Sequence, residues 1–262
     1  AGRRFTCGVT TSSTVECWGT GADGQLGDGS SGMGTQSSTS VQVQLDYNNW
    51  SAQAVAVGRS HACALVESTS DATDKRVFCW GDNASGQVGD SSTSQRTTPV
   101  EVDHDFSQDT AVELAAGGDT ACMVVEDSTG TPAAHCWGAN GSGQVGDGST
   151  TDRNDPREVD GSFEFTSLGV GVDHTCGMLS NGTTKCWGDN SLGQLGDGTS
   201  GGNETTPVDV TGSLAFARLG LGEDVTCGIT TDDTVYCWGS NADGRLGTAG
   251  GDASSPTGIA TP

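Results

Sequence analysis

Apolar residues occur along this chain in short runs that end at Gly, Asn, Asp or Ser. Examples of these runs are Ala54–Val57, Val112–Ala115, Phe163–Val170 and Leu214–Leu221. Short runs that are rich in Val, Thr and aromatic residues and bounded by turn residues predict β-strands. No stretch shows the sustained period of an amphipathic helix. The pattern therefore predicts an all-β protein with no helix of consequence.

The tripeptide Cys-Trp-Gly recurs along the chain at intervals of 50 to 62 residues. Its copies begin at Cys17, Cys79, Cys136, Cys186 and Cys237. A Gly-x-x-x-x-Cys element precedes each copy, and a Gly- and Asn-rich motif that usually contains Gly-Gln-Leu/Val-Gly follows it. Repeats of this length are typical of propellers and solenoids, whose stacked units bury a core together. Four short strands in about 51 residues predict one propeller blade per repeat.

The repeats predict a single β-propeller domain with five visible four-stranded blades. The ring is expected either to close with five blades or to form part of a larger propeller. A Pro-containing strand is expected to begin a unit at Pro99, Pro156, Pro207 and Pro256. One aliphatic residue per motif is expected to anchor its loop inward: Leu26, Val88, Val145, Leu195 and Leu246. The expected units span residues 1–40, 41–98, 99–155, 156–206 and 207–255, and residues 256–262 are expected to start a further or shared blade.

The ten cysteines fall two to a repeat, which favours one disulfide within each blade. Directly opposed positions on two antiparallel strands lie within disulfide reach. The expected pairs are Cys7–Cys17, Cys63–Cys79, Cys122–Cys136, Cys176–Cys186 and Cys227–Cys237. A metal site and reduced core cysteines are the alternatives, although no Cys or His spacing matches a zinc motif. Disulfides indicate an oxidising compartment, so the protein is expected to be secreted or to lie at the cell surface.

The net charge argues against nucleic-acid binding, and the hydropathy of the chain argues against membrane insertion. The 262 residues include 11 Lys and Arg against 34 Asp and Glu, a formal net charge of −23. A chain with so few basic residues has no face that could neutralise a run of phosphates, so nucleic-acid binding is not expected. No apolar stretch approaches the roughly 20 residues that span a bilayer. We therefore expect neither a nucleic-acid partner nor membrane insertion.

The run from His174 to Gly198 reads His-Thr-Cys-Gly-Met-Leu-Ser-Asn-Gly-Thr-Thr-Lys-Cys-Trp-Gly-Asp-Asn-Ser-Leu-Gly-Gln-Leu-Gly-Asp-Gly. This run resembles the repeat of the regulator of chromosome condensation family. Members of that family are β-propellers with blades of similar length, and the resemblance covers essentially the whole chain. The paired cysteines resemble secreted bacterial members of the superfamily. Family propellers commonly have seven blades. The resemblance implies the fold, but function does not transfer with a fold.

No catalytic constellation or cofactor motif is visible, so we expect a protein that is not an enzyme and needs no cofactor. His61 and His174 share a repeat position that elsewhere holds Phe5 or Val225, which indicates packing. His135 is expected on a strand face, and His104 in a solvated turn. Carboxylates such as Asp147, Asp152 and Asp155 share a loop but match no calcium-binding spacing, so turn formation is favoured and no metal site is expected. Calcium or glycan binding stays open as a minor alternative.

Irregular segments remain as candidates for partner binding, because repeat proteins place function in them. The segment between the paired cysteines is longer in the second and third units than in the others, and a long excursion ends near Tyr47 and Trp50. Neighbouring hairpins are expected to form one ridge with a local positive feature at Lys75-Arg76. The candidate partner-binding residues are Asp71, Asp74, Lys75, Arg76, Glu126, Asp127, Tyr47 and Trp50. The favoured function is a secreted, non-catalytic protein-recognition module; the alternative is a structural repeat domain of a larger extracellular adhesin or surface assembly.

Overall fold

The computed structural model describes residues 1–259 and is built almost wholly of antiparallel strands. The first sheet has three strands, β1 (Phe5–Val9), β2 (Val15–Thr20) and β3 (Gln36–Gln42). The second sheet contains β4 (Trp50–Val57), β5 (His61–Ser68), β6 (Lys75–Gly81) and β7 (Arg96–Glu101). The third contains β8 (Thr110–Gly117), β9 (Thr120–Glu126), β10 (Pro132–Gly138) and β11 (Arg153–Glu158).

Two further four-stranded sheets complete the described chain. The fourth contains β12 (Phe165–Val170), β13 (His174–Leu179), β14 (Thr184–Asp189) and β15 (Asn203–Asp209). The fifth contains β16 (Phe216–Leu221), β17 (Val225–Thr230), β18 (Val235–Gly239) and β19 (Ala253–Gly258), with one 3-10 turn, η1 (Ala242–Gly244), before β19. The all-β propeller prediction is confirmed, with five sheets that act as blades.

The expected unit boundaries, after residues 40, 98, 155, 206 and 255, each fall inside the last strand of a sheet. Pro99, Pro156, Pro207 and Pro256 lie in β7, β11, β15 and β19, each of which is the last strand of its sheet rather than the first strand of the next. Residues 256–258 therefore belong to the fifth sheet and begin no further blade, and residues 260–262 lie outside the described part. Proline is tolerated at such a position because an outermost strand needs no second ladder of hydrogen bonds. The sequence pattern alone does not tell which neighbour a strand pairs with.

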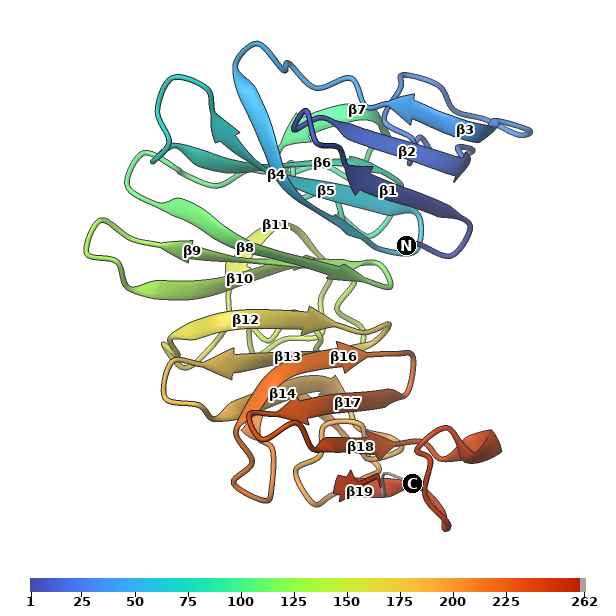
Figure 1. Ribbon diagram of the computed structural model, residues 1–262, viewed down its shortest axis with the longest axis vertical. Helices are drawn as coiled ribbons and strands as arrows, with labels where there is room; N and C mark the ends of the chain where they lie inside the picture. Colours follow the sequence, from blue (N-terminus) through green and yellow to red (C-terminus); the bar gives the residue numbers. More distant parts are fainter. Residues whose placement is uncertain (260–262) are drawn as a thin grey trace.

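The sheets follow one another along an open arc rather than a closed ring. Figure 1 shows the first and second sheets side by side at one end of the long axis and the fifth sheet at the other end. Among residues 1–259, the first sheet packs against the second and the fifth against the fourth, and there is no comparable packing between the first and fifth sheets. Of the two expected arrangements, the closed five-bladed ring is therefore not formed by the described chain.

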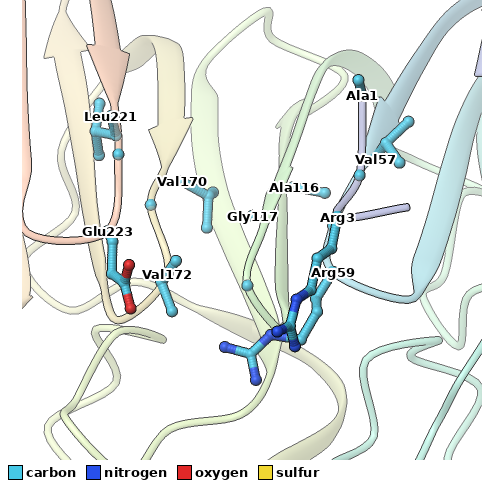
Figure 2. Close-up of a pocket in the computed structure, with 15 residues that line it drawn as sticks. Ala1, Arg3, Val57, Arg59, Ala116, Gly117, Val170, Val172, Leu221 and Glu223 are labelled. Carbon is cyan, nitrogen blue, oxygen red and sulfur yellow. The ribbon is translucent and has the colours of Figure 1, made fainter. Parts of the chain in front are cut away.

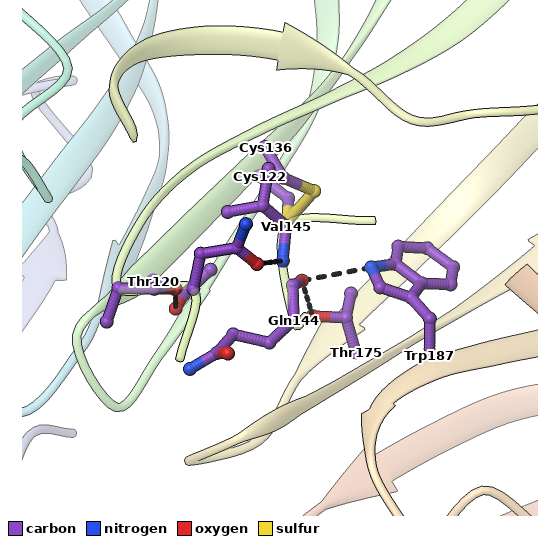
Figure 3. The surroundings of a disulfide bond; sticks show 9 residues. Thr120, Cys122, Cys136, Gln144, Val145, Thr175 and Trp187 are labelled. Carbon is purple, nitrogen blue, oxygen red and sulfur yellow. Dashed lines mark hydrogen bonds between the residues drawn. A yellow bond between two sulfur atoms is a disulfide. The ribbon is translucent and has the colours of Figure 1, made fainter. Parts of the chain in front are cut away.

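The core lies between consecutive sheets and is built from the repeated motif. The Trp80, Trp137, Trp187 and Trp238 side chains are fully buried, whereas Trp18 in the first sheet is 39% exposed. Each expected anchor residue, from Leu26 to Leu246, is also buried, which confirms its inward orientation. The indole of Trp187 donates a hydrogen bond of 2.9 Å to the Gln144 carbonyl of the preceding sheet (Figure 3). Equivalent bonds join Trp80 to Gln25 and Trp137 to Gln87.

All five disulfides form as expected, one within each sheet. The paired cysteines stand directly opposite each other, with Cα atoms 4.0 to 4.1 Å apart. The sequence separation varies from 10 to 16 residues because the turns beyond the cysteines differ in length. Each disulfide therefore fixes the register of the two middle strands of its blade, while the hairpin end is free to vary.

Candidate functional site

The expected ridge is formed by two hairpins that lie on the same side of the molecule. The β5–β6 and β9–β10 turns both project to the left in Figure 1. Thr110 at the start of β8 joins them, because its hydroxyl donates to the Thr73 carbonyl at 2.9 Å and its backbone pairs with Glu126. The structure therefore brings the predicted hairpin residues of the second and third sheets onto one face. Whether this face binds a partner stays a prediction.

The local positive feature expected at Lys75-Arg76 is absent, because both cations are paired within their own sheet. The Lys75 Nζ lies 3.6 Å from the Glu67 carboxylate. The Arg76 guanidinium contacts Asp74 at 2.8 Å and Glu101 at 3.0 Å. Neighbouring carboxylates thus neutralise a pair that looked isolated in the sequence.

The two aromatic candidates are held by the fold. The Tyr47 hydroxyl accepts a hydrogen bond of 2.9 Å from the Val15 backbone N–H. The half-buried Trp50 ring lies 5.6 Å from the Phe78 ring, and the Arg76 guanidinium lies over the Trp50 ring at 5.2 Å from its centroid. Both side chains therefore fasten the excursion to the first two sheets, and neither stands free as an anchor.

The remaining hairpin candidates, Asp71 and Asp127, serve their own turns. Each carboxylate accepts hydrogen bonds from the backbone and hydroxyl of the threonine two residues later, Thr73 or Thr129. These hydrogen bonds lower the pKa of both carboxyl groups, with the threonine hydroxyl as the largest cause. Both carboxylates are fully solvent-exposed, which makes them suitable sites for control substitutions.

Two predictions about histidine have different outcomes. His61 and His174 are fully buried, as a packing position requires. The solvated turn expected for His104 was wrong. The His104 ring packs 4.9 Å from both Phe106 and His135, and its Nε2 lies 3.0 Å from the Asp109 carboxylate. Two acidic neighbours in sequence suggested solvent exposure, but the ring contacts Phe106 and Asp109 of its own segment and His135 of β10.

The loop carboxylates considered for calcium have structural partners. Asp147 pairs with Arg153 and accepts from the buried Asn140 amide, and Asp152 accepts from the Asn140 backbone N–H at 2.9 Å. Asp155 lies 2.9 Å from the Arg157 guanidinium. No group of three or more His, Cys, Asp or Glu suited to a metal ion occurs within residues 1–259. These carboxylates therefore fold the Gly- and Asn-rich loops.

A cavity of about 600 Å³ lies at the centre of the arc, lined by the turns between the first two strands of the second to fifth sheets and by the residues before β1. Its wall includes the backbone of Gly58, Gly117, Gly171 and Gly222. A Cβ atom at Gly117 would lie only 2.2 Å from the Val170 carbonyl, so glycine is required for neighbouring turns to pack this closely. Backbone hydrogen bonds also join neighbouring turns, from the Arg59 N–H to the Gly118 carbonyl and from the Val172 N–H to the Gly222 carbonyl. The cavity is thus a consequence of the repeat itself.

The charge of the cavity rim changes sign around the arc. The two residues after each cavity glycine are Arg3-Arg4, Arg59-Ser60, Gly118-Asp119, Val172-Asp173 and Glu223-Asp224. Arg3, Arg59 and Glu223 line the cavity itself, and the other charged residues directly follow a lining residue in sequence, so cations lie on the side of the first two sheets and carboxylates on the side of the last three. Figure 2 shows Glu223 and Arg59 approaching the cavity from opposite sides. The sequence analysis missed these residues, although an alignment of the five units at the cavity glycine contains the signal.

The carboxylates on this rim lie close enough to influence one another. Burial is the largest cause of the raised pKa of Asp119, Asp173 and Asp224. Repulsion from neighbouring carboxylates raises each pKa further, with Asp189 acting on both Asp173 and Asp224. Arg59 opposes the shift at Asp119 and Asp173, and its guanidinium lies 3.4 Å from the Asp119 carboxylate. The acidic part of the rim thus behaves as one electrostatic unit.

Two sequence models described as the regulator of chromosome condensation (RCC1) repeat match the chain. One covers residues 74–125 and 133–178, and the other covers residues 165–194 and 217–245. The chain belongs to the RCC1 repeat family. Propellers of this type are typically non-catalytic binding or exchange-factor domains, and they commonly mediate protein interactions.

Among curated relatives, the chain is 28% identical over 185 residues to the ultraviolet-B receptor UVR8 of Arabidopsis thaliana. It is 32% identical over 173 residues to the probable E3 ubiquitin-protein ligase HERC4 of Rattus norvegicus. These matches cover 70% and 64% of this chain but only 39% and 15% of the two relatives. The chain therefore matches only a part of these longer relatives.

Solved structures agree on the fold. Human WBSCR16 has a TM-score of 0.84 at 20% identity, and the match covers all of this chain and 66% of that one. Prp20p from Saccharomyces cerevisiae, whose structure was described with its binding to Gsp1p and histones, has a TM-score of 0.80 at 20% identity over 64% of its length. The ectodomain of the Physcomitrella patens receptor kinase CR4 has a TM-score of 0.57 at 26% identity, covering 91% of this chain and 50% of that one.

Proposed function

We propose that this protein is a secreted, non-catalytic module that recognises another protein through the face around its central cavity. The observation that carries the proposal is the division of charge around the cavity: Arg3 and Arg59 line it on one side, and Glu223 lines it on the other, where Asp173 and Asp224 directly follow lining residues in sequence. Complementary charge on a partner would fix the orientation in which it docks. The regular blades hold this rim rigid, because the glycine turns are joined by backbone hydrogen bonds.

Two observations support an extracellular setting. Five disulfides are typical of an oxidising compartment. The plant receptor ectodomain at 26% identity is an extracellular protein part with a related fold. Within residues 1–259, no helix is long and apolar enough to cross a membrane.

The test is capture of a binding protein from the extracellular fraction of the source, followed by purification of that protein and measurement of its affinity. The proposal predicts saturable one-to-one binding that is lost when the disulfides are reduced and the chain is unfolded. Absence of any saturable extracellular partner would overturn it.

The predicted ridge is tested separately by shortening the β5–β6 and β9–β10 hairpins to the form of Gly177–Lys185, with the cysteines kept. The fold is expected to survive, because the β13–β14 hairpin already has this length. Partner affinity that is unchanged in this variant would leave the cavity face as the contact surface. Affinity that is lost while the fold is intact would move the site to the ridge.

The alternative function, a structural repeat in a larger extracellular assembly, is favoured by one observation. Trp18 on the first sheet and Ile229 on the fifth are 39% and 38% exposed, whereas the tryptophans equivalent to Trp18 are fully buried between sheets. The first and fifth sheets thus each expose, within the described chain, a face of the kind that packs against a neighbouring sheet elsewhere in the molecule. Light scattering across a range of concentrations tests this function: a strictly monomeric protein whose Trp18 is quenched freely by iodide would argue against it.

A further inference from the structure

Asn-x-Ser/Thr tripeptides are the acceptor sequence for N-linked glycans, and the structure divides the five that occur in this chain into buried and exposed ones. They begin at Asn49, Asn83, Asn140, Asn181 and Asn203. The Asn83 and Asn140 side chains are fully buried in the Gly- and Asn-rich loops. The amide nitrogen that would carry a sugar donates there to the Ser94 carbonyl or to the Thr151 carbonyl, each at 3.0 Å. A glycan has no room at these two positions in the folded protein.

Two of the three exposed asparagines use their amide nitrogen within the fold. The Asn49 Nδ2 donates to the Asp46 carboxylate at 2.6 Å, and the rest of its tripeptide lies in β4. The Asn203 amide nitrogen lies 3.3 Å from the Gly202 carbonyl and 3.2 Å from the Asp189 carboxylate, and its whole tripeptide lies in β15. Both tripeptides therefore belong to a strand that is paired with its neighbour, which makes them less accessible to a transferase than a turn would be.

Asn181 differs from both, because its tripeptide forms an exposed turn and its amide nitrogen is unused. The turn joins β13 to β14, and Gly182 within it has a φ of +84°. The Asn181 side-chain carbonyl accepts hydrogen bonds from the Thr183 hydroxyl at 2.8 Å and from the Thr183 backbone N–H at 3.0 Å. Within residues 1–259, Asn181 Nδ2 donates to no protein group. A sugar on this nitrogen would leave both hydrogen bonds of the turn intact.

The equivalent turns of the second and third sheets show that this turn does not require an amide. The Asp71 and Asp127 carboxylates occupy the same position and accept the same two hydrogen bonds, from the hydroxyl and backbone N–H of Thr73 or Thr129. The turn therefore needs only an acceptor oxygen at this position. Its geometry does not account for the nitrogen that Asn181 carries in addition, and that nitrogen is the group that points to a modification.

We propose that Asn181 is the acceptor for an N-linked glycan. The transfer forms a bond between Asn181 Nδ2 and the anomeric carbon of a sugar. It breaks the bond between that carbon and the phosphate of a lipid-linked sugar donor. The amide loses one proton, which the released lipid phosphate takes up, so no oxidant or reductant is needed.

The position of the turn connects the glycan to partner binding. β13 has six residues, which span about 20 Å, and the turn that lines the cavity at Gly171 lies at its other end. A glycan on Asn181 therefore covers the hairpin end of the fourth sheet and leaves the cavity face open to a protein partner. This inference rests on the proposed function through its extracellular setting.

Peptide mass spectrometry of the protein from the extracellular fraction of its source tests the proposal, because trypsin places the five tripeptides on five different peptides. After reduction, the peptide 158–185, which contains Asn181, is expected to carry a sugar mass, and the peptides 77–96 and 97–153, which contain Asn83 and Asn140, are expected to carry none. An extracellular protein whose peptide 158–185 is unmodified would overturn this inference and leave the proposed function standing. A modified protein that binds no saturable partner would overturn the proposed function and leave this inference standing.

Matched variants secreted from the same source separate the turn from the mere presence of the tripeptide. Asn181→Asp and Thr183→Ala should each abolish the modification, whereas Thr183→Ser, which keeps a hydroxyl, should retain it. Asp71→Asn creates the tripeptide in the equivalent turn of the second sheet, so the peptide 60–75 should gain a sugar mass. The melting temperature verifies that each variant is folded. A sugar that persists on the peptide 158–185 in Asn181→Asp, or that is found on the peptide 77–96 of the folded protein, would contradict the proposal.

Discussion

Two tryptophans with the same sequence context test how the blades are held together. Trp187 and Trp18 both stand in Cys-Trp-Gly, yet the first is fully buried and the second is 39% exposed. Trp187 fills the space beside Gly146 of the preceding sheet and donates to the Gln144 carbonyl. Trp18 has no preceding sheet in the described chain. Trp187→Ala and Trp18→Ala therefore form a matched pair of substitutions.

The expected losses differ because only one substitution opens a closed cavity. Replacement of a fully buried Trp by Ala costs about 3–5 kcal/mol, which includes the cavity left behind. The Gln144 carbonyl keeps a second bond, from the Thr175 hydroxyl at 2.9 Å, so little is added for an unpaired acceptor (Figure 3). At Trp18 water fills the vacated space, which leaves only the loss of partial burial, about 2 kcal/mol. We expect the free energies of unfolding to differ by about 2 kcal/mol.

Urea denaturation followed by far-ultraviolet circular dichroism measures this difference, with disulfides verified by mass spectrometry in both variants. For a chain of this size, 2 kcal/mol corresponds to about 4–8 °C in melting temperature. The reasoning would be refuted if Trp18→Ala lost as much stability as Trp187→Ala. That result would mean that the indole stabilises its own sheet and that contact with the preceding sheet adds nothing.

Three further predictions concern stability and the predicted ridge. Burial lowers the pKa of His61 to about 4, so the free energy of unfolding should fall by about 3 kcal/mol for this residue as the pH drops from 6.5 through 4. The variant His61→Phe carries the residue that Phe5 provides at the same repeat position, and its free energy of unfolding in urea should depend less on pH across that range. An unchanged pH dependence would argue against this role of His61. Replacement of Cys176 and Cys186 by Ala should cost about 2–3 kcal/mol by thermal unfolding, and no loss would show that the loop closure is unimportant. Arg76→Ala should increase the quenching of Trp50 fluorescence by iodide, because the guanidinium that lies over the ring is removed. The contribution of the other tryptophans is subtracted with variants that lack Trp50. Unchanged quenching would show that the guanidinium does not cover Trp50 in solution.

The repeat made the fold predictable, because one motif seen five times fixes strands, anchor residues and disulfides together. The Cys176–Cys186 register followed from two strands of equal length around a centred turn. The grouping of strands into sheets was not predictable, because Pro207 and Val208 read equally well as the first strand of one blade or the last of another. Hydrogen bonds between β14 and β15 decide this, and they depend on contacts that the local pattern does not encode.

The candidate site was predictable only in part. The hairpin residues were found from insertions, but the sequence could not show that Glu67, Asp74 and Glu101 pair with Lys75 and Arg76. The cavity rim was missed because its charged residues, such as Arg59 and Asp173, lie far apart in sequence. Each occupies an ordinary turn, and only the circular stacking of the blades brings the turns together.

Photo-crosslinking from the cavity wall tests the central claim most directly. A photoreactive amino acid at Val172, which lines the cavity beside Asp173, is compared with one at Asn181 in the exposed β13–β14 turn on the hairpin side. Both sites lie in the fourth sheet, so folding and expression are matched. The account predicts that a purified extracellular partner crosslinks from position 172. Crosslinking from position 181 with none from position 172 would contradict the account.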